Sequence, residues 1–542
     1  MIQGKKLKRV KNRIINRKEQ GITLIALVIT IIILLILATV TLNVVLGEGG
    51  LIDRAQQAKD MTEQAALEEQ QGLNSLMSEY ANIMAEDQTP PEPEIPYIDD
   101  SIVEAPQTSS GMTPVKYDEN QSKWIKTEVT DSEWYDYGNK EWANVVLVGE
   151  NGKDADGDQD VFNSDGTLNE DSNYSMLVWI PRYAYKINSQ YHQSGTGAGE
   201  IDIVFIGTDN KGKDGSKTYS TEYPEGTTGG AMSDYVVHPA FDYGGTALAG
   251  FWVGKFETSH TGCTTDKSTG ETNTDVTTLT AQIKPGVTSW RSINVSDIFT
   301  VCTNMNAAGN PYGLNTSDSV VDPHMMKNSE WGSVAYLSQN ATYGKGSEVW
   351  INPNSNYITG QAGSSVSAGS TTSTSNYNTG NGPQASTTGN VTGVYDMSGG
   401  AWEYTAAYIN NSYTQSGGGS YIYAQSLMDS VNAGNTKYAD VYKVTSDSQS
   451  NNYNNAQPTM GQGTPTKDTG HYGDAVWETS NNYSSTNCWY SDYSNFPNSY
   501  VPFFIRGGGS YNDRTIAGVF SFNGSDGYLG LSSFRVVVPV LQ

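Results

Sequence analysis

FIRGGGSYNDRTIAGVFSFNGSDGYLGLSSFRVVV, residues 504–538, places glycine, small polar and aromatic residues between two apolar runs. Each run is short and rich in Phe, Ile or Val, which favours strand over helix. Arg506 is followed by Gly507, Gly508 and Gly509, and glycine backbone adopts the positive φ that a tight crossing of strands needs. The segment therefore predicts a polar loop within a scaffold of strands.

The composition indicates a large, acidic and loop-rich chain. At 542 residues, two or more structural parts are expected. The 58 acidic against 32 basic residues, a formal net charge of -26, argue against nucleic acid as a partner, because phosphate contact needs a cationic surface. With 57 glycines, 34 tyrosines and only 17% charged residues, the chain is typical of a polar ectodomain in which strands and turns dominate.

The N-terminal region predicts a membrane helix. ITLIALVITIIILLILATVTLNVV, residues 22–45, contains no charged residue and follows a cluster of lysines and arginines. As a helix with a rise of about 1.5 Å per residue, this run spans a bilayer core of roughly 30 Å. We expect a transmembrane or pilin-type helix at 22–46, with the basic side in the cytoplasm. The predicted location is therefore a single-pass cell-membrane protein with an extracellular C-terminal part, at the cell surface or in a pilus.

RKEQGITLIALVITII, residues 17–32, resembles the prepilin leader of type IV pilins and type II secretion pseudopilins. The resemblance implies a leader at 1–21, cleavage after Gly21 by a prepilin peptidase, methylation of Ile22, and other pilin subunits as partners. Ala26 stands where the family carries glutamate. In a filament that buried carboxylate pairs with the N-terminus of the next subunit. The chain is then either a minor subunit at a filament tip or a plain membrane anchor.

Two segments are expected to connect this region to the body. Apolar residues at three- and four-residue spacing predict an amphipathic helix at 51–87. The segment TPPEPEIPYIDD lies within a stiff Pro/acidic linker at 88–110.

The remaining part, 111–542, alternates short apolar runs with low-complexity polar insertions. Strands are predicted within MLVWIPRYAYKI (176–187), GFWVGKFE (250–257), VYDMSGGAWEYTAAY (394–408) and FRVVVPV (534–540). WGSVAYLSQ (331–339) is one of the few helix candidates.

GFWVGKFE, VYDMSGGAWEYT and IRGGGSY…SSFRVVV resemble, in order, motifs of the formylglycine-generating-enzyme and sulfatase-modifying-factor family. The resemblance implies a C-type-lectin-like fold. The predicted fold class is α+β, a pilin-type transmembrane helix followed by a loop-rich domain with small twisted sheets. The residues assigned to its scaffold are Trp402, Glu403, Arg506 and Arg535.

The motifs also predict a buried Arg/Glu pair that ties the sheet together. Glu403 lies between Trp402 and Tyr404, so in a strand it faces away from both aromatic rings. In some relatives this acidic residue helps to hold calcium. Gly400, however, replaces the asparagine of the family motif.

The oxidases of this family hold copper through two cysteines, and the corresponding positions here are Asp513 and Gly518. Neither supplies the thiolate that a cuprous ion needs, so we predict that the chain is not an enzyme. His238, in VVHPAF, is interpreted as a cap for local backbone. Of the three cysteines, Cys263 and Cys302 are the expected disulfide pair, and Cys488 is buried or free.

One acidic loop is a candidate calcium site. DADGDQD supplies Asp154, Asp156, Asp158 and Asp160, and alternating carboxylates suit a hard cation. Gly157 does not stand where an EF-hand loop requires glycine, so a solvated acidic loop is the alternative. No other cofactor is expected.

The segment after the GGS turn also resembles the hypervariable region of receptor proteins diversified by retroelements. The resemblance implies contact with a protein or glycan ligand; an ordinary polar loop is the alternative. Tyr, Asn, Ser and Asp offer contact area and hydrogen bonds at low entropic cost. The ligand-binding residues so predicted are Tyr511, Asn512, Asp513, Arg514, Thr515, Ser521, Asn523, Ser525, Asp526, Tyr528 and Leu531.

The expected function is non-enzymatic ligand binding or adhesion, displayed by a pilin-like anchor and exerted through the C-terminal loop. The alternatives are a structural minor pilin and an extracellular oxidase-like enzyme on the same scaffold.

Overall fold

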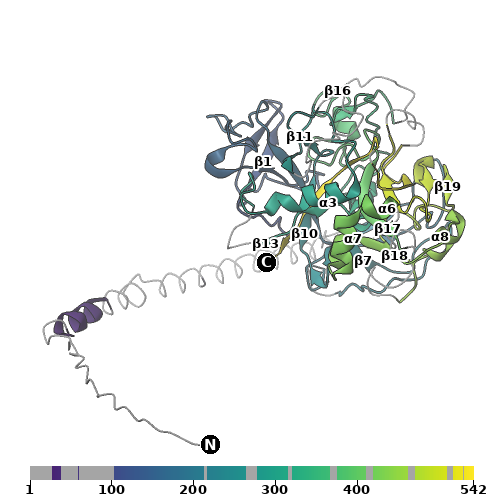
Figure 1. The fold of residues 1–542 in the computed structure, drawn as a ribbon, viewed down its shortest axis with the longest axis horizontal. Helices are drawn as coiled ribbons and strands as arrows, with labels where there is room; N and C mark the ends of the chain where they lie inside the picture. The colour runs from purple at the N-terminus through teal and green to yellow at the C-terminus, as the bar shows by residue number, and fades with distance from the viewer. Residues whose placement is uncertain are drawn as a thin grey trace, which may run out of the picture. The chain divides into compact units, whose positions relative to one another are not determined.

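The computed structural model divides the chain into two units, Met1–Ile98 and Asp99–Gln542 (Figure 1). The residues that it describes are 27–37, 59, 103–212, 217–263, 278–314, 320–366, 375–410, 419–461, 470–509, 517–528 and 530–541.

The first unit corrects the prediction of a transmembrane helix at 22–46. Its described helical segment is residues 27–37. Within the described ranges, no helix is both long and apolar enough to cross a membrane. The predictions of a pilin-type membrane helix and of a single-pass membrane location are therefore wrong. Gly21, Ile22 and most of the segment 51–87 lie outside the described residues.

The second unit contains a seven-stranded antiparallel sheet, which we call the first sheet. Its order is β14-β24-β10-β4-β3-β1-β2. The apolar run 250–257 contains β10, whose residues are all buried and which pairs with both β4 and β24. The strands are β1 (Met112–Asp118), β2 (Lys123–Lys126), β3 (Asn144–Leu147), β4 (Ser175–Pro181), β10 (Gly250–Gly254), β14 (His324–Met325) and β24 (Val536–Val538).

A second seven-stranded sheet is mixed, with the order β18-β17-β21-β22-β20-β19 and β23 paired beside β17. β17 is parallel to β18 and β23 but antiparallel to β21. The strands are β17 (Glu403–Ile409), β18 (Asp440–Tyr442), β19 (Ser484–Ser485), β20 (Ser494–Asn495), β21 (Phe503–Arg506), β22 (Phe522–Ser525) and β23 (Ser533–Phe534).

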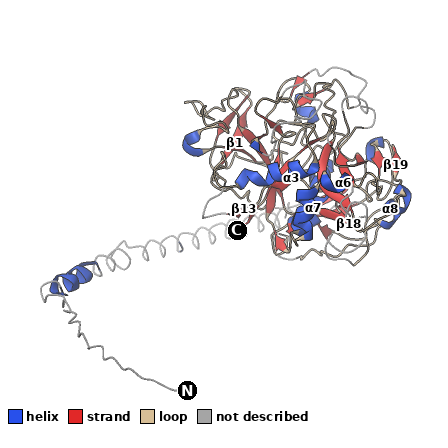
Figure 2. Cartoon of the chain, in the orientation of Figure 1, coloured by secondary structure: helices blue, strands red, loops and turns tan. Residues whose placement is uncertain are grey.

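The other described elements of the second unit are short helices and strands (Figure 2). The predicted helix at 331–339 is confirmed as part of α4, which is buried along nearly its whole length. The helices are α3 (Val295–Thr303), α4 (Asn328–Gln339), α6 (Gly419–Ile422), α7 (Gln425–Asn432) and α8 (Gln449–Asn455). The remaining strands are β5 (Tyr183–Ile187), β6 (Ile201–Phe205), β7 (Val236–Val237), β8 (Asp242–Tyr243), β9 (Thr246–Ala247), β11 (Ser259–His260), β12 (Ala281–Gln282), β13 (Val320–Val321), β15 (Gln361–Ala362), β16 (Ser375–Asn376) and β25 (Val540–Leu541).

The predicted fold class is corrected accordingly. In place of a transmembrane helix followed by a lectin-like domain, the described residues form a mixed, sheet-rich fold with few helices. The expected Cys263–Cys302 disulfide is also wrong. Cys302 is buried on α3, and the sulfur of Cys263 lies 3.6 Å from the carbonyl oxygen of Ser289.

A buried ion pair joins the two large sheets. Arg535 Nη2 and Nε lie 2.6 and 3.1 Å from the two carboxylate oxygens of Glu403 on β17. The same guanidinium donates to the carbonyl oxygens of Gly254, on β10, at 2.7 Å and Tyr395 at 2.9 Å. The predicted Arg/Glu pair is thus present, but the arginine is Arg535. Arg506, although opposite Glu403 in the strand register, donates instead to three backbone carbonyls.

His238 is confirmed as a cap. Its Nδ1 accepts from the backbone N–H of Ala240 at 3.3 Å at the start of the turn η2 (Pro239–Phe241). The ring is fully buried, with ring centroids 5.2 Å from Tyr183 and 5.3 Å from Tyr185. Burial disfavours the charged imidazolium and lowers the pKa of His238 from 6.5 to about 3.

We expect Arg535→Met to lower the free energy of unfolding by about 3–5 kcal/mol, because it leaves a buried carboxylate without its counter-charge. The matched control is Lys116→Met, which removes a cation from a surface pair with Asp131 and Glu133. The control should cost much less, since exposed ion pairs contribute little. Urea unfolding checks both; equal losses would contradict the importance of the buried pair.

Acid should destabilise the protein partly through His238. Between pH 6.5 and about 3 the unfolded chain binds a proton at this residue and the folded chain does not. Stability is therefore lost as pH falls below 6.5, by about 1.4 kcal/mol per pH unit for this one group. Between pH 6.5 and about 3, His238→Gln should reduce the slope of the free energy of unfolding against pH by about 1.4 kcal/mol per pH unit. Urea unfolding at pH 7, 6, 5 and 4 measures it, and parallel curves would disprove the assignment.

Candidate functional site

The C-terminal segment is held by a buried arginine. Arg506, at the end of β21, donates from Nε to the carbonyl oxygen of Ser521 at 2.9 Å. Its other nitrogens donate to the carbonyl oxygens of Asp474 at 2.9 Å and Ala475 at 3.0 Å. Its guanidinium lies 5.6 Å from the ring of Trp331 on α4. The Arg506 side chain thereby links the end of β21 both to Ser521 and to the buried segment at Asp474 and Ala475.

The structure separates the predicted ligand-binding residues into four groups. Tyr511, Asn512, Asp513, Arg514 and Thr515 lie outside the described residues. Ser521 is fully buried and accepts from the backbone N–H of Tyr493 at 3.2 Å, so it belongs to the interior. Asn523 and Ser525, on β22, are half-buried, and their side chains contact Asn495 at 2.6 Å and the hydroxyl of Tyr404 at 2.7 Å. Asp526, Tyr528 and Leu531 are exposed.

The exposed residues stand on a fixed backbone. Tyr528 is 45% exposed and Leu531 is 42% exposed. The Tyr404 hydroxyl donates to the Tyr528 carbonyl oxygen at 2.9 Å. The backbone N–H of Ser292 donates to the carbonyl oxygen of Gly530, between the two exposed residues, at 2.8 Å. Their side chains are therefore exposed to solvent next to carbonyl oxygens, at residues 528 and 530, that accept hydrogen bonds from the core.

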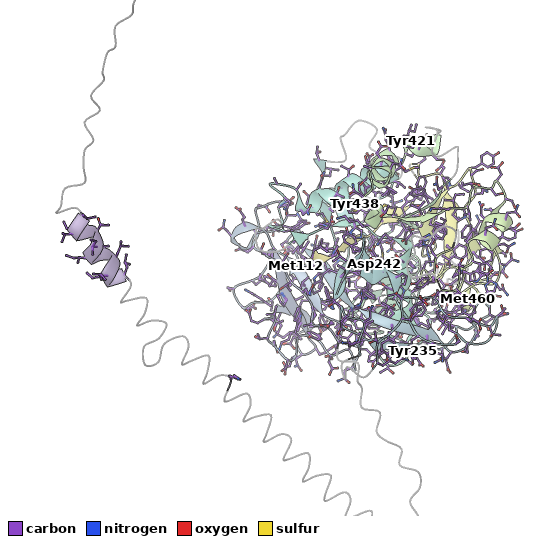
Figure 3. The ribbon with its side chains drawn as sticks, turned by 90° about the horizontal axis from the view of Figure 1, so that it is seen from below. Met112, Tyr235, Asp242, Tyr421, Tyr438 and Met460 are labelled. Carbon is purple, nitrogen blue, oxygen red and sulfur yellow. The ribbon has the colours of Figure 1, made fainter. Side chains whose placement is uncertain are left out.

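A second segment adds apolar surface next to this loop. The ring of Tyr423 lies 4.5 Å, between centroids, from that of Tyr528. Its neighbour Ile422, at the end of α6, is 56% exposed. Tyr421 lies at the edge of the second unit (Figure 3). Sequence reasoning missed this segment; the signal that could have found it is the run of Tyr421, Ile422 and Tyr423 between polar stretches.

The scaffold residue Trp402 lies beside Gly509, where a Cβ would be 3.1 Å from its ring. It is half-buried, and its ring lies 6.3 Å, between centroids, from that of Tyr493. Its neighbour Glu403 carries the ion pair with Arg535. Burial raises the pKa of Glu403 to about 7, against the opposing effect of Arg535. The predicted scaffold set thus forms buried or half-buried contacts around the C-terminal strands.

Two buried carboxylates lie directly against Gly518 and Gly400. The carboxylate of Asp492 accepts from the backbone N–H of Phe520 at 2.9 Å, and a Cβ on Gly518 would lie 2.0 Å from either of its oxygens. Glu257 accepts from the backbone N–H of Ala401 at 2.7 Å, and a Cβ on Gly400, which has φ +67°, would lie 2.2 Å from Glu257 Oε1. At both positions the neighbouring carboxylate occupies the space that a Cβ would take.

The predicted calcium loop is organised by hydrogen bonds. Asp154 Oδ1 accepts from the backbone N–H of Gly157 at 3.1 Å, and its Oδ2 accepts from that of Asn173 at 2.9 Å. Asp160 pairs with Lys153 at 2.9 Å, Asp158 contributes its carbonyl oxygen to Lys153 at 3.4 Å, and Asp156 accepts from Asn173. Over the described ranges, no group of three or more His, Cys, Asp or Glu is arranged to hold a metal ion.

In comparisons of the sequence with known protein families and with curated proteins, nothing matches. The resemblances to pilins and to formylglycine-generating enzymes therefore stay predictions.

We expect Gly518→Ala to destabilise the fold by about 1–3 kcal/mol, because its Cβ would overlap the Asp492 carboxylate. Gly197→Ala is the matched control, since a Cβ there meets nothing within 4 Å. Thermal unfolding compares the two variants. If both shift the transition equally, the space beside Asp492 is larger than described.

Proposed function

We propose that the chain is a non-enzymatic ligand-binding protein, and that its ligand contacts the C-terminal surface made by Asp526, Tyr528, Leu531 and Ile422. The observation that carries this proposal is the combination of exposed apolar side chains with fixed backbone. Tyr528 and Leu531 are nearly half exposed, yet the carbonyl oxygens of residues 528 and 530 accept hydrogen bonds from the core.

The energetics of binding favour such a surface. A tyrosine offers a large contact area, with a polar hydroxyl, and loses little rotamer entropy when it binds. A loop held before the ligand arrives also reduces the cost of ordering it. The exposed carboxylate of Asp526 beside Tyr528 supplies a hydrogen-bond acceptor at the same surface. These properties suit a protein or glycan ligand.

The surroundings of Gly518 also support a non-enzymatic function. Copper chemistry of the resembled oxidases needs a thiolate at this position, whereas Asp492 occupies the space that a side chain would take. Burial raises the pKa of Asp492 well above its usual range, which favours a protonated, uncharged carboxyl group there. No observation in the described residues favours the structural-pilin alternative.

We expect a panel of glycans and proteins to contain a ligand whose binding is weakened at least about tenfold by Tyr528→Ala or Leu531→Ser, because each removes contact area from the surface. Tyr500→Ala is the matched control, since Tyr500 is 67% exposed in a different turn at 498–501. Biolayer interferometry measures the affinities, and thermal unfolding checks that each variant is folded.

Equal affinity of all three variants and the wild type for the identified ligand would remove this surface as the binding site. Turnover of a bound ligand that needs Asp492 would contradict the non-enzymatic assignment.

A further inference from the structure

A cavity of about 460 Å³ lies at the N-terminal end of α4 and contains none of the sequence-predicted site residues. Its walls come from the hairpin of β8 and β9, the start of α4, the turn η6 (Thr436–Tyr438) and β18. Volumes of 300–1,000 Å³ are usual for pockets that bind small molecules. The size therefore suits a molecule of one or two sugar rings.

Cationic groups outnumber anionic ones on the wall. Lys327, Lys437 and Lys443 line the cavity, in a chain whose formal net charge is -26. Two carboxylates also line it. Asp242 accepts from the backbone N–H of Gly245 at 2.7 Å, and Asp440 from that of Ser329 at 2.7 Å. Both carboxylates therefore already accept hydrogen bonds from backbone N–H groups around the cavity.

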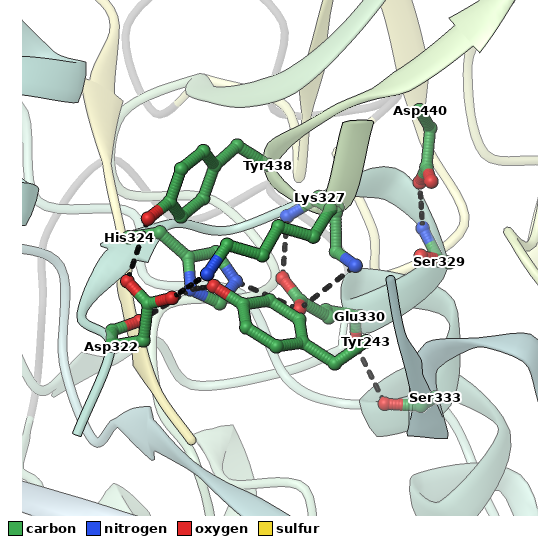
Figure 4. Close-up of polar contacts among 10 residues, drawn as sticks. Tyr243, Asp322, His324, Lys327, Ser329, Glu330, Ser333, Tyr438 and Asp440 are labelled. Atoms are coloured by element: carbon green, nitrogen blue, oxygen red, sulfur yellow. Dashed lines mark hydrogen bonds and ion pairs between the residues drawn. The ribbon is translucent and has the colours of Figure 1, made fainter. Parts of the chain in front are cut away.

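Two of the lysines are held in place by carboxylates that stand behind the wall (Figure 4). Glu330 accepts from the Nε2 of His324 at 2.9 Å and lies 3.4 Å from the ammonium of Lys327. Asp322 pairs with Lys437 and accepts from the Tyr438 hydroxyl at 2.8 Å.

These pairs are stable charges of the folded protein. Burial raises the pKa of Glu330, but Lys327 and His324 outweigh that effect and hold the net pKa below its usual value. An ammonium has three N–H donors, and the carboxylate behind each lysine leaves donors for a further acceptor. The lysines are thereby positioned before a ligand arrives, which lowers the entropic cost of binding.

We propose that this cavity binds a small acid of sugar size, whose carboxylate or phosphate contacts Lys437 and Lys443. The inference is independent of the proposed binding surface at Tyr528, because the two sites share no residue. The protein therefore carries a small-molecule site in addition to its C-terminal surface.

Isothermal titration calorimetry of the full chain tests this site with four probes: glucuronate, glucose 6-phosphate, glucose and inorganic phosphate. We expect both acidic sugars to bind at least about tenfold more tightly than glucose, since a charge-assisted hydrogen bond contributes that much affinity. Lys443→Met, which removes a cation from the exposed rim, should weaken the acidic sugars about tenfold. Thr436→Trp, also at an exposed position on the wall, should abolish binding by filling the cavity.

Lys116→Met is the charge-matched control and should bind like the wild type, since Lys116 belongs to a surface pair that does not line the cavity. The proposal is overturned if none of the probes binds, if glucose binds as tightly as glucuronate, or if both wall variants retain wild-type affinity. Inorganic phosphate binding as tightly as glucose 6-phosphate would contradict a ligand of sugar size. The cavity variants should bind the ligand of the Tyr528 surface with wild-type affinity. That result would separate failure of the cavity site from failure of the C-terminal surface.

Discussion

The bidentate ion pair between Arg535 and Glu403 is the interaction on which the two large sheets depend. Arg535 precedes β24 of the first sheet, and Glu403 begins β17 of the second. Because the same guanidinium also bonds the carbonyl oxygens of Gly254 and Tyr395, four separate segments meet at one cation. A charge placed so deep is costly unless every donor is satisfied, which constrains the positions of all four segments together. The C-terminal surface and its loop are built on that arrangement.

Sequence predicted those elements best in which a short apolar run coincides with a buried strand or helix. GFWVGKFE and FRVVVPV contain buried strands, WGSVAYLSQ lies within α4, and His238 caps the turn that follows it. The prediction of a transmembrane helix at 22–46 depended on apolar composition alone, and within the described residues no helix is long and apolar enough to cross a membrane.

The sites were harder to predict than the strands. The sequence indicated a buried Arg/Glu pair, but Glu403 pairs with Arg535 rather than with Arg506 opposite it in the register. Side-chain direction and the nearby carbonyls of Asp474 and Ala475 decide this choice, and neither is encoded in spacing. Likewise, the cavity at α4 joins Lys327, Lys437 and His471 from separate segments. Ser521 lay within the polar loop by sequence, yet the fold buries it.

Each glycine that faces a buried acid is coupled to that acid in its tolerance of substitution. At Gly400 and Gly518 the neighbouring carboxylate fills the space that a side chain would need. The glycine and the acid therefore constrain each other's substitution. A single substitution at either glycine meets a steric barrier while Glu257 or Asp492 is present. Replacing the acid first leaves a hole and an unpaired backbone N–H at Ala401 or Phe520. Exchange at these positions therefore requires two coordinated changes, and single-site variation will be tolerated mainly in the exposed loops.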